Sequence, residues 1–482
     1  MRNNGCIAVF SATIALVAAN RLATSAPQSD AELTAVLAEL RAELDELRAA
    51  TNGSQQWLNE ARAEEVKQLV RDVLSDAGSR TSFDEGYETS GFIRGLWVGS
   101  ADGNFRLAFR GFTQVRYTVD QRNETTGAQN SNDSTWGFED RRTRISLEGC
   151  AGDPSWRYRA EFQTGSGQAT MTATDLWIEK SFSDELSLRV GQFKPGYLRE
   201  FDVSALAPVF ADRSSTAVFF LPQRTIGAQL TWESEDFRLQ ATFANAFEVR
   251  SNYYNSGNLR GVPWNSPQNA PYAVLGRAAW LAAGTWEQLA SFTGWRGGEF
   301  GALVGVAGQV MKRNNNVGVP TAYGDIKPLV IGATADVTLQ FNGASLSSWF
   351  AWRQIDPCES GLAAANQYGV VIQGGLFVSD EVELIARYEY GSADTMPNGE
   401  TPVVQTLPSN NGYSTISAAS LGVNWYIARQ RVRITTDVSY AFTGIGAFAD
   451  PNSNFLQDGT SASGAFDADG QVLIRAQLQI IF

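Results

Sequence analysis

The sequence predicts an all-β membrane protein, a 16-stranded antiparallel transmembrane β-barrel with an N-terminal helical coiled-coil segment. Three observations predict this fold. The segment from Gln471 to Phe482 alternates apolar and polar side chains, as a strand does when its two faces meet different surroundings. Similar segments follow one another from residue 104 onward, with connections that are short on one side and mostly long on the other. No run of about 18 apolar residues is present, so the sequence predicts no membrane-spanning helix.

The chain begins with the features of a secretory signal peptide, which we place at residues 1–26. Arg2 supplies a short positive region, residues 7–19 form an apolar core, and small residues follow up to Ala26. We expect cleavage after Ala19 or Ala26. The apolar core is too short to span a membrane.

Residues 30–75 carry an apolar repeat of helical spacing. Leucines recur at intervals of four and three residues, at Leu33, Leu37, Leu40, Leu44 and Leu47. After a break at residues 52–53 the apolar seam resumes with Val66, Leu69 and Val73. The spacing predicts a coiled coil with a stutter; the alternative is a single amphipathic helix that lies on its own protein. A polar linker is expected at 76–103, ahead of the barrel at 104–482.

Sixteen strands are expected in the barrel. Their ranges are 104–119, 138–150, 155–165, 173–182, 185–194, 224–233, 236–246, 273–284, 299–312, 329–341, 343–354, 368–377, 381–390, 417–427, 432–442 and 469–482. Connections after even-numbered strands are mostly short, and Asn342-Gly343 has the composition of a two-residue hairpin turn. A longer stretch at 285–298 is the exception. This parity is typical of an outer-membrane barrel, and a soluble sandwich or propeller gives no reason for it.

Arginines gather on one face of these strands. Arg106, Arg110 and Arg116 oppose Phe109 and Val115, and charges on the lipid face would cost ~2–4 kcal/mol each near the bilayer midplane. We therefore expect an inward-facing basic set that forms a path for anions: Arg106, Arg110, Arg116, Arg142, Arg144, Arg157, Arg159, Arg189, Arg238, Arg433 and Arg475. Acidic residues share this face, so the alternative is that Arg–Glu pairs only stabilise the wall.

The connection 195–223 is unusually apolar for an exposed loop. Residues 205–210 and 217–221 are almost entirely apolar. We expect the loop to fold into the lumen and narrow it, with Asp212 and Arg213 near the constriction. Packing at a subunit interface is the alternative.

Composition excludes several classes of function. The chain contains no histidine, which removes the commonest general base and metal ligand, so no enzyme activity, metal or cofactor is expected. The net charge of −13 argues against nucleic acid as a partner.

Five motifs, in order, resemble the phosphate-selective porin O and P family. They are residues 100–107 (SADGNFRL), 189–195 (RVGQFKP), Asp212-Arg213-Ser214 leading to Arg224, 421–426 (LGVNWY) and 473–478 (LIRAQL). The resemblance covers about 92–482 and implies a 16-stranded trimeric porin of a Gram-negative-type outer membrane, with arginines along an anion path and a terminal Phe used in assembly. Arg106, Arg110 and Lys194 are the positions to which we carry over a role in that path.

The expected function is passive diffusion of small solutes, with a preference for anions such as phosphate, through an arginine-lined lumen. A general nonselective porin is one alternative, and a structural or adhesive envelope protein tethered by its coiled coil is another. The expected partners are outer-membrane lipid, two further copies in a homotrimer, small anionic solutes and, through a periplasmic coiled coil, peptidoglycan.

Overall fold

The computed structural model describes Ala42 and residues 90–92, 96–122, 134–165, 168–247, 270–312, 327–356, 358, 364–393, 415–443, 445, 448, 455 and 470–482. The chain divides into two units, residues 1–86 and 87–482. In the first unit only Ala42 is described, within a helical turn. The expected signal peptide and the expected coiled coil therefore lie outside the described residues.

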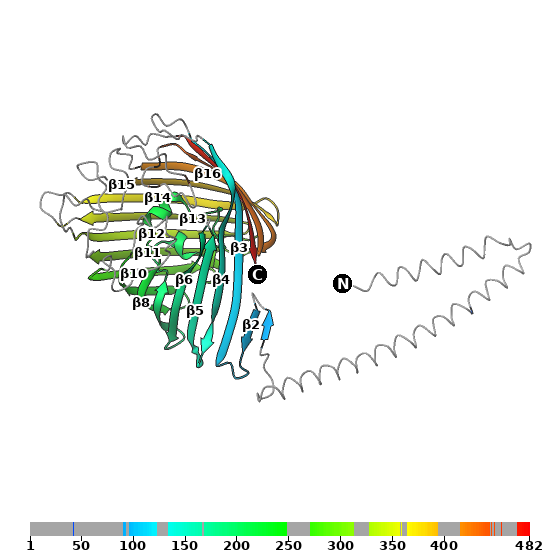
Figure 1. Ribbon diagram of the computed structural model, residues 1–482, viewed down its shortest axis with the longest axis vertical. Coiled ribbons are helices and arrows are strands. Elements are labelled where there is room, and N and C mark those ends of the chain that lie inside the picture. The colour runs from blue at the N-terminus through cyan, green and yellow to red at the C-terminus, as the bar shows by residue number, and fades with distance from the viewer. Residues whose placement is uncertain are drawn as a thin grey trace, which may run out of the picture. The chain divides into compact units, whose positions relative to one another are not determined.

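The second unit is a closed antiparallel barrel of sixteen strands, β3 to β18, and the prediction of this fold is confirmed (Figure 1). The strands are β3 (Phe105–Gln121), β4 (Ser134–Ala151), β5 (Asp153–Gly165), β6 (Gln168–Ser181), β7 (Leu186–Phe193), β8 (Thr225–Glu233), β9 (Phe237–Ala244), β10 (Tyr272–Ala283), β11 (Gly301–Lys312), β12 (Leu329–Phe341), β13 (Ala344–Asp356), β14 (Ala365–Phe377), β15 (Val382–Ala393), β16 (Thr415–Gln430), β17 (Val432–Ala441) and β18 (Gln471–Ile481). Each pairs with its sequence neighbours, because hairpin connections place consecutive strands side by side.

Strand β18 closes the ring by pairing with β3, from Val472 opposite Gln121 to Ile481 opposite Phe112. Its polar residues are buried inside the barrel, as Arg475 and Gln477 show, while Ile474 and Leu478 are exposed on the outside. The alternation that predicted a barrel strand is thus the alternation between lumen and lipid.

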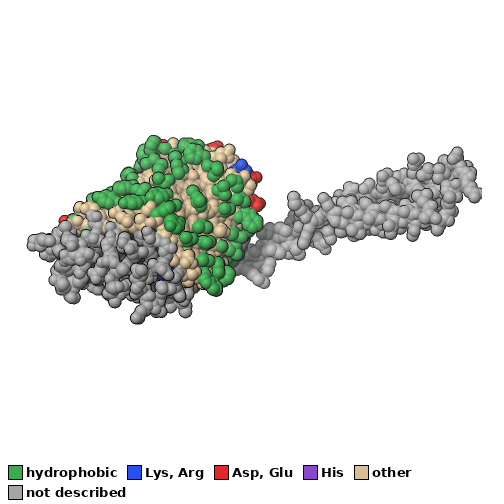
Figure 2. Space-filling view, turned by 90° about the horizontal axis from the view of Figure 1, so that it is seen from above, with side chains coloured by type: hydrophobic (Ala, Val, Ile, Leu, Met, Phe, Trp, Pro, Cys, Tyr) green, Lys and Arg blue, Asp and Glu red, His purple; other side chains and the backbone are tan. Residues whose placement is uncertain are grey.

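Apolar side chains cover the outer face of the strands (Figure 2). Leu421 is 67% exposed, and Val306, Phe350 and Tyr388 are among the other large apolar residues on this face. A surface of this extent would be an aggregation hazard in water, whereas lipid covers it in a membrane.

A short hairpin lies within the expected linker and was not predicted. Strand β1 (Ser90–Phe92) pairs with β2 (Leu96–Gly99), and β2 pairs with β3 between Phe109 and Arg106. This part of β3 lies beyond the residues that pair with β18, so β2 continues the line of β18 past the C-terminus (Figure 1).

The two rims of the barrel differ in the length of their connections. The turns after β4, β6, β8, β12, β14 and β16 are tight and lie on the same rim. We call the rim that carries them the short-turn rim. The segment 284–300 between β10 and β11 is longer and contains the 3-10 helix η2 (Gln288–Ala290). On the other rim, the connection between β5 and β6 is only residues 166–167, whereas residues 194–224 between β7 and β8 carry helices α3 (Arg199–Asp202) and α4 (Ser215–Phe220).

Candidate channel interior and basic cavity

Residues 194–224, here called the lumen loop, fold inside the barrel. Tyr197, Phe210, Phe219 and Phe220 are fully buried, and their packing against the inner wall removes a large apolar area from water. The two helices of the loop are the short green coils within the strands of Figure 1. Burial of the aromatic residues explains why so apolar a segment occurs between two barrel strands.

The wall binds the main chain of the lumen loop around most of the ring. Carbonyl oxygens of Ala205, Pro208 and Val209 accept hydrogen bonds from the side chains of β3, β17 and β16. The carboxylate of Asp437 accepts from Ala211 N at 3.0 Å, and that of Glu389 accepts from Thr216 N at 2.8 Å. These bonds satisfy backbone groups that would otherwise be buried without partners, so the loop is held by the wall rather than merely packed on it.

Asp212 of the lumen loop is bound by three arginines of the wall. Its carboxylate lies 2.9 Å from Arg116, 2.6 Å from Arg141 and 2.9 Å from Arg142. Arg141 and Arg142 are adjacent in sequence, and a strand normally points such neighbours to opposite faces. A β-bulge in β4 removes this conflict, because Gln114 pairs with Arg142 while the next residue of β3 pairs with Asp140. Both arginines therefore reach the lumen.

A cavity of about 500 Å³ lies between the lumen loop and strands β3 to β11. Four acidic residues line it: Glu148, Glu161, Asp175 and Asp202. Eight basic residues line it, of which the sequence predicted Arg110, Arg144, Arg159, Arg189, Lys194 and Arg238 and missed Arg199 and Arg277. Basic residues therefore outnumber acidic residues in the lining of the cavity.

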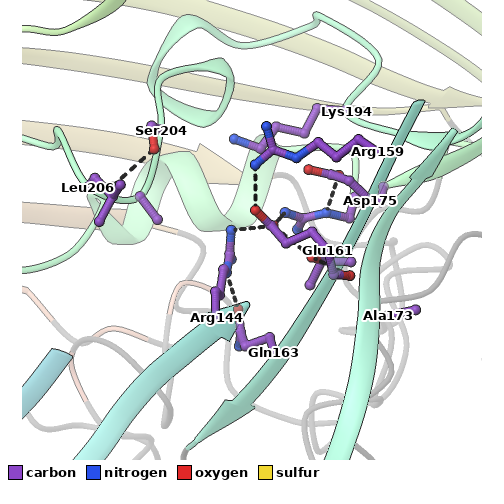
Figure 3. A network of polar contacts seen from close by, with 12 residues as sticks. Arg144, Arg159, Glu161, Gln163, Ala173, Asp175, Lys194, Ser204 and Leu206 are labelled. Atoms are coloured by element: carbon purple, nitrogen blue, oxygen red, sulfur yellow. Dashed lines mark hydrogen bonds and ion pairs between the residues drawn. The ribbon is translucent and has the colours of Figure 1, made fainter. Parts of the chain in front are cut away.

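The cations of the cavity are held in a network of ion pairs (Figure 3). Arg144 lies 3.0 Å and Arg159 lies 2.6 Å from the two oxygens of Glu161. Asp175, which accepts from Arg224 at 2.8 Å, and Lys194 complete the cluster. Since Glu161 is shared by Arg144, Arg159 and Arg224, the network fixes these arginines in place.

Aromatic rings also orient the arginines of the cavity. The guanidinium of Arg189 lies 4.3 Å from the ring centre of Trp177, and that of Arg238 lies 4.1 Å from Trp286. Stacking on a ring restrains each guanidinium, while Glu179 pairs with Arg189 and Glu233 pairs with Arg238 at the guanidinium edge.

Burial shifts the protonation of charged groups in the lumen loop. Burial and the nearby Arg213 lower the pKa of Lys194 well below its usual range, and burial raises the pKa of Asp202. Burial alone would raise the pKa of Asp212, but its arginine partners outweigh this effect and hold the pKa well below the usual range. Asp212 is therefore a permanent counter-ion in the lumen.

The other residues proposed for the anion path lie elsewhere. Arg116 and Arg142 bind Asp212, Arg475 binds Asp437, and Arg433 donates to Pro208 O at 3.1 Å. Arg157 pairs with Glu179, and Arg106 lies over Trp97 at 4.7 Å, but neither lines the cavity. Arg213 donates to Glu200 O at 2.8 Å. Contacts with residues elsewhere in the chain leave no periodic signal in a sequence, so these side chains could not be told from path residues.

The missed cavity residues show the same limit. Arg277 is on β10, where its neighbours are small and apolar, and it pairs with Asp336 at 2.8 Å. Its inward position could have been found from the alternation of β10. Arg199 enters the cavity from helix α3, and no strand period predicts its direction.

Among the described residues, no group of histidine, cysteine, aspartate and glutamate side chains could hold a metal ion. No helix that the structure describes is both long and apolar enough to pass through a bilayer.

A closed sixteen-stranded barrel with an apolar outer face and a charged interior is the architecture of an outer-membrane channel. The sequence profile of the phosphate-selective porin O and P family matches residues 113–441, from within β3 to the end of β17. The chain belongs to this family, as the sequence motifs predicted.

Several solved structures are similar to this chain at low sequence identity. An anion-selective porin from Comamonas acidovorans is 9% identical, with a TM-score of 0.50 over 78% of this chain and 99% of that one. The outer membrane channel DcaP of Acinetobacter baumannii is 10% identical, with a TM-score of 0.48 over 79% and 99% of the two chains. OmpT of Vibrio cholerae is 14% identical, with a TM-score of 0.45 over 79% and 98%. Curated protein sequences contain no match to this chain.

Proposed function

We propose that this protein is a porin for the passive diffusion of small anions, phosphate or similar, through the basic cavity. The observation that carries the proposal is that eight basic residues but only four acidic residues line the cavity. Guanidinium groups match the geometry of phosphate and carboxylate oxygens, so a solute of this class finds donors along the wall.

The acidic residues of the cavity suit a channel. Conduction requires that a solute bind well enough to enter and weakly enough to leave. Glu148 lies between Arg110 at 2.6 Å and Arg159 at 3.2 Å and neutralises part of their charge. An anion therefore meets a series of partly compensated cations and is not trapped by any of them.

The lumen loop is the proposed constriction. Asp212 and Arg213 lie in the middle of this loop, and their contacts fix its path across the lumen. In this proposal neither residue is a binding site for the solute. They hold the loop in the position that narrows the channel.

Assembly as a homotrimer in outer-membrane lipid is part of the proposal, and it agrees with the trimer form of OmpT among the similar structures. Short turns face the periplasm in bacterial barrels, and on this ground we propose that the expected coiled coil of residues 30–75 is periplasmic. There it would support the trimer or reach peptidoglycan.

The test is the reversal potential of single channels in a chloride or phosphate gradient, measured on the full mature chain. We expect wild type to favour anions and Arg189→Gln to reduce that preference. Arg157→Gln is the matched control, because Arg157 shares Glu179 with Arg189 but does not line the cavity. A channel that conducts without anion preference, or equal effects of the two substitutions, would overturn the proposal.

A general porin is the second candidate, because the strand arginines of the cavity also have acidic partners. This holds for Arg110, Arg144, Arg159, Arg189, Arg238 and Arg277. If these pairs cancel the field of the lining, the same reversal potentials will lie near zero. This outcome selects the nonselective alternative directly.

A further inference from the structure

We propose that residues 284–300, here called the rim strap, cover one half of the short-turn rim and confine solute exit to the half lined by the basic cavity. The inference rests on the proposed function, since it concerns the route of the solute. It makes the rim strap a specificity-determining element of the channel, in addition to the lumen loop.

The rim strap is anchored to strands far from its own. The ring of Trp295 lies 4.8 Å from that of Tyr426 on β16 and 5.4 Å from that of Phe377 at the end of β14. Gln430 donates to Thr293 Oγ1 at 3.0 Å. From its attachment at β10, the strap therefore passes along the ends of β12 to β16.

Hydrogen bonds to the intervening turn fix this course. Gly297 N donates to Asn342 Oδ1 at 2.6 Å, and Gly343 N donates to Trp295 O at 3.2 Å. Gln340 Nε2 donates to Ser291 O at 2.9 Å. Because both its main chain and its rings have partners on the rim, the strap is a packed element of the barrel rather than a free connection.

The strap also turns apolar residues into the barrel, where they meet the lumen loop. Phe292 is buried in one cluster with Val203, Phe210 and Ile385. Arg199 of the lumen loop donates to Leu289 O and lies 5.5 Å from the ring of Phe292. The lumen loop and the strap, which enter from opposite rims, thus pack on each other on the side of the ring that the strap crosses, along β12 to β16.

The cavity lies on the opposite half. Its strand residues come from β3 to β11, with Ile481 at the end of β18. Trp286, at the start of the strap, lines the border of the cavity, and the guanidinium of Arg238 lies over its ring. On the covered half, Arg387 and Arg433 donate to carbonyls of the lumen loop. The strap thus directs a solute along the arginines of β3 to β10.

Two serines on inner faces of the wall provide a matched test. Ser146 on β4 and Ser347 on β13 are similarly buried, at 7% and 6% exposed, but only Ser146 lines the cavity. Ser146→Cys and Ser347→Cys would be made in full-length protein with Cys6, Cys150 and Cys358 changed to serine. Labelling with an anionic sulfonate thiol reagent is followed by mass spectrometry. We expect labelling at position 146 to be at least about tenfold faster, because the reagent reaches it through a cationic cleft.

Opening the strap should remove this difference. In Phe292→Ala/Trp295→Ala we expect the thiol at position 347 to label nearly as fast as the thiol at position 146, and the channel conductance to rise. The control is Phe300→Ala, because Phe300 is exposed and packs on Phe341 at 5.4 Å. Equal labelling at the two positions in the parent barrel would overturn the inference, and this comparison stands even if the strap variant does not fold.

The labelling result is independent of conductance. A barrel that labels selectively at position 146 but shows no anion preference contradicts the proposed function and leaves the strap inference intact. A barrel that prefers anions but labels equally at both positions contradicts the strap inference alone.

Discussion

Gly111 in β3 and Phe482, the last residue, exchange two main-chain hydrogen bonds, Gly111 N to Phe482 O at 2.8 Å and Phe482 N to Gly111 O at 2.9 Å. The ring of Phe482 occupies the space that a Cβ at position 111 would need. Where β3 pairs with the end of the chain, the lack of a side chain at Gly111 therefore leaves room for the aromatic ring of Phe482.

Gly111→Leu should displace the Phe482 ring and weaken closure. Overpacking of this kind costs about 1–3 kcal/mol, so we expect a lower melting temperature in heat-modifiability gels. Gly137→Leu on β4 is the control, because a Cβ there meets nothing within 4 Å. Equal melting temperatures of the two variants would contradict the packing of Phe482 against Gly111.

Asp212→Asn should destabilise the barrel and raise its anion preference. Three buried guanidinium groups lose their shared counter-ion, and removal of one partner of a buried pair costs about 3–5 kcal/mol. Urea unfolding from vesicles measures the loss, and reversal potentials measure the preference. Asp380→Asn, at an exposed pair with Arg296, should cost less than about 1 kcal/mol. A comparable loss in both variants would show that Asp212 is not an anchor.

Anion preference should increase as the pH is lowered. Burial raises the pKa of Asp202, so this cavity residue takes up a proton at a higher pH than an ordinary aspartate and its negative charge is lost. Arg277, Lys194, Arg199 and Asp336 surround it, and the three cations oppose the shift without reversing it. In Asp202→Asn we expect high anion preference already at neutral pH and a flatter pH profile. Asp236 lies in an exposed turn, so Asp236→Asn should retain the wild-type pH profile. If this control also lost the pH response, the response could not be attributed to Asp202.

Arg475→Ala should reduce stability without changing anion preference. Arg475 is buried against Asp437 at 2.7 Å and lies outside the cavity lining, so its loss leaves a buried carboxylate without its cation. Asp437→Ala in the same chain should recover part of the stability, since both charges are then absent. A large drop in anion preference with unchanged stability would place Arg475 on the solute path instead.

The strand pattern could be read from sequence because it is local. Val472, Ile474 and Leu478 face lipid while Gln477 and Arg475 face the lumen, and this contrast repeats every two residues whatever the rest of the chain does. The same period placed Arg110 and Arg189 on the inner face, and in the structure both line the cavity.

The period fails where the register shifts. Arg141 was not predicted to face inward, because a bulge that depends on pairing with β3 puts it beside Arg142. The hairpin of β1 and β2 is likewise stabilised by a partner strand outside the hairpin, since β2 pairs with β3.

By itself, the sequence determined the barrel, its strand count, the inner and outer faces and the family, since alternation, turn residues and motifs are properties of neighbouring residues. Only the tertiary structure decided which arginines line the cavity and which hold the lumen loop. Arg116 and Arg110 occupy equivalent positions in the pattern of β3, yet one binds Asp212 and the other faces the cavity. The difference depends on where a loop about 100 residues later crosses the lumen, and long-range packing of that kind leaves no period in the chain.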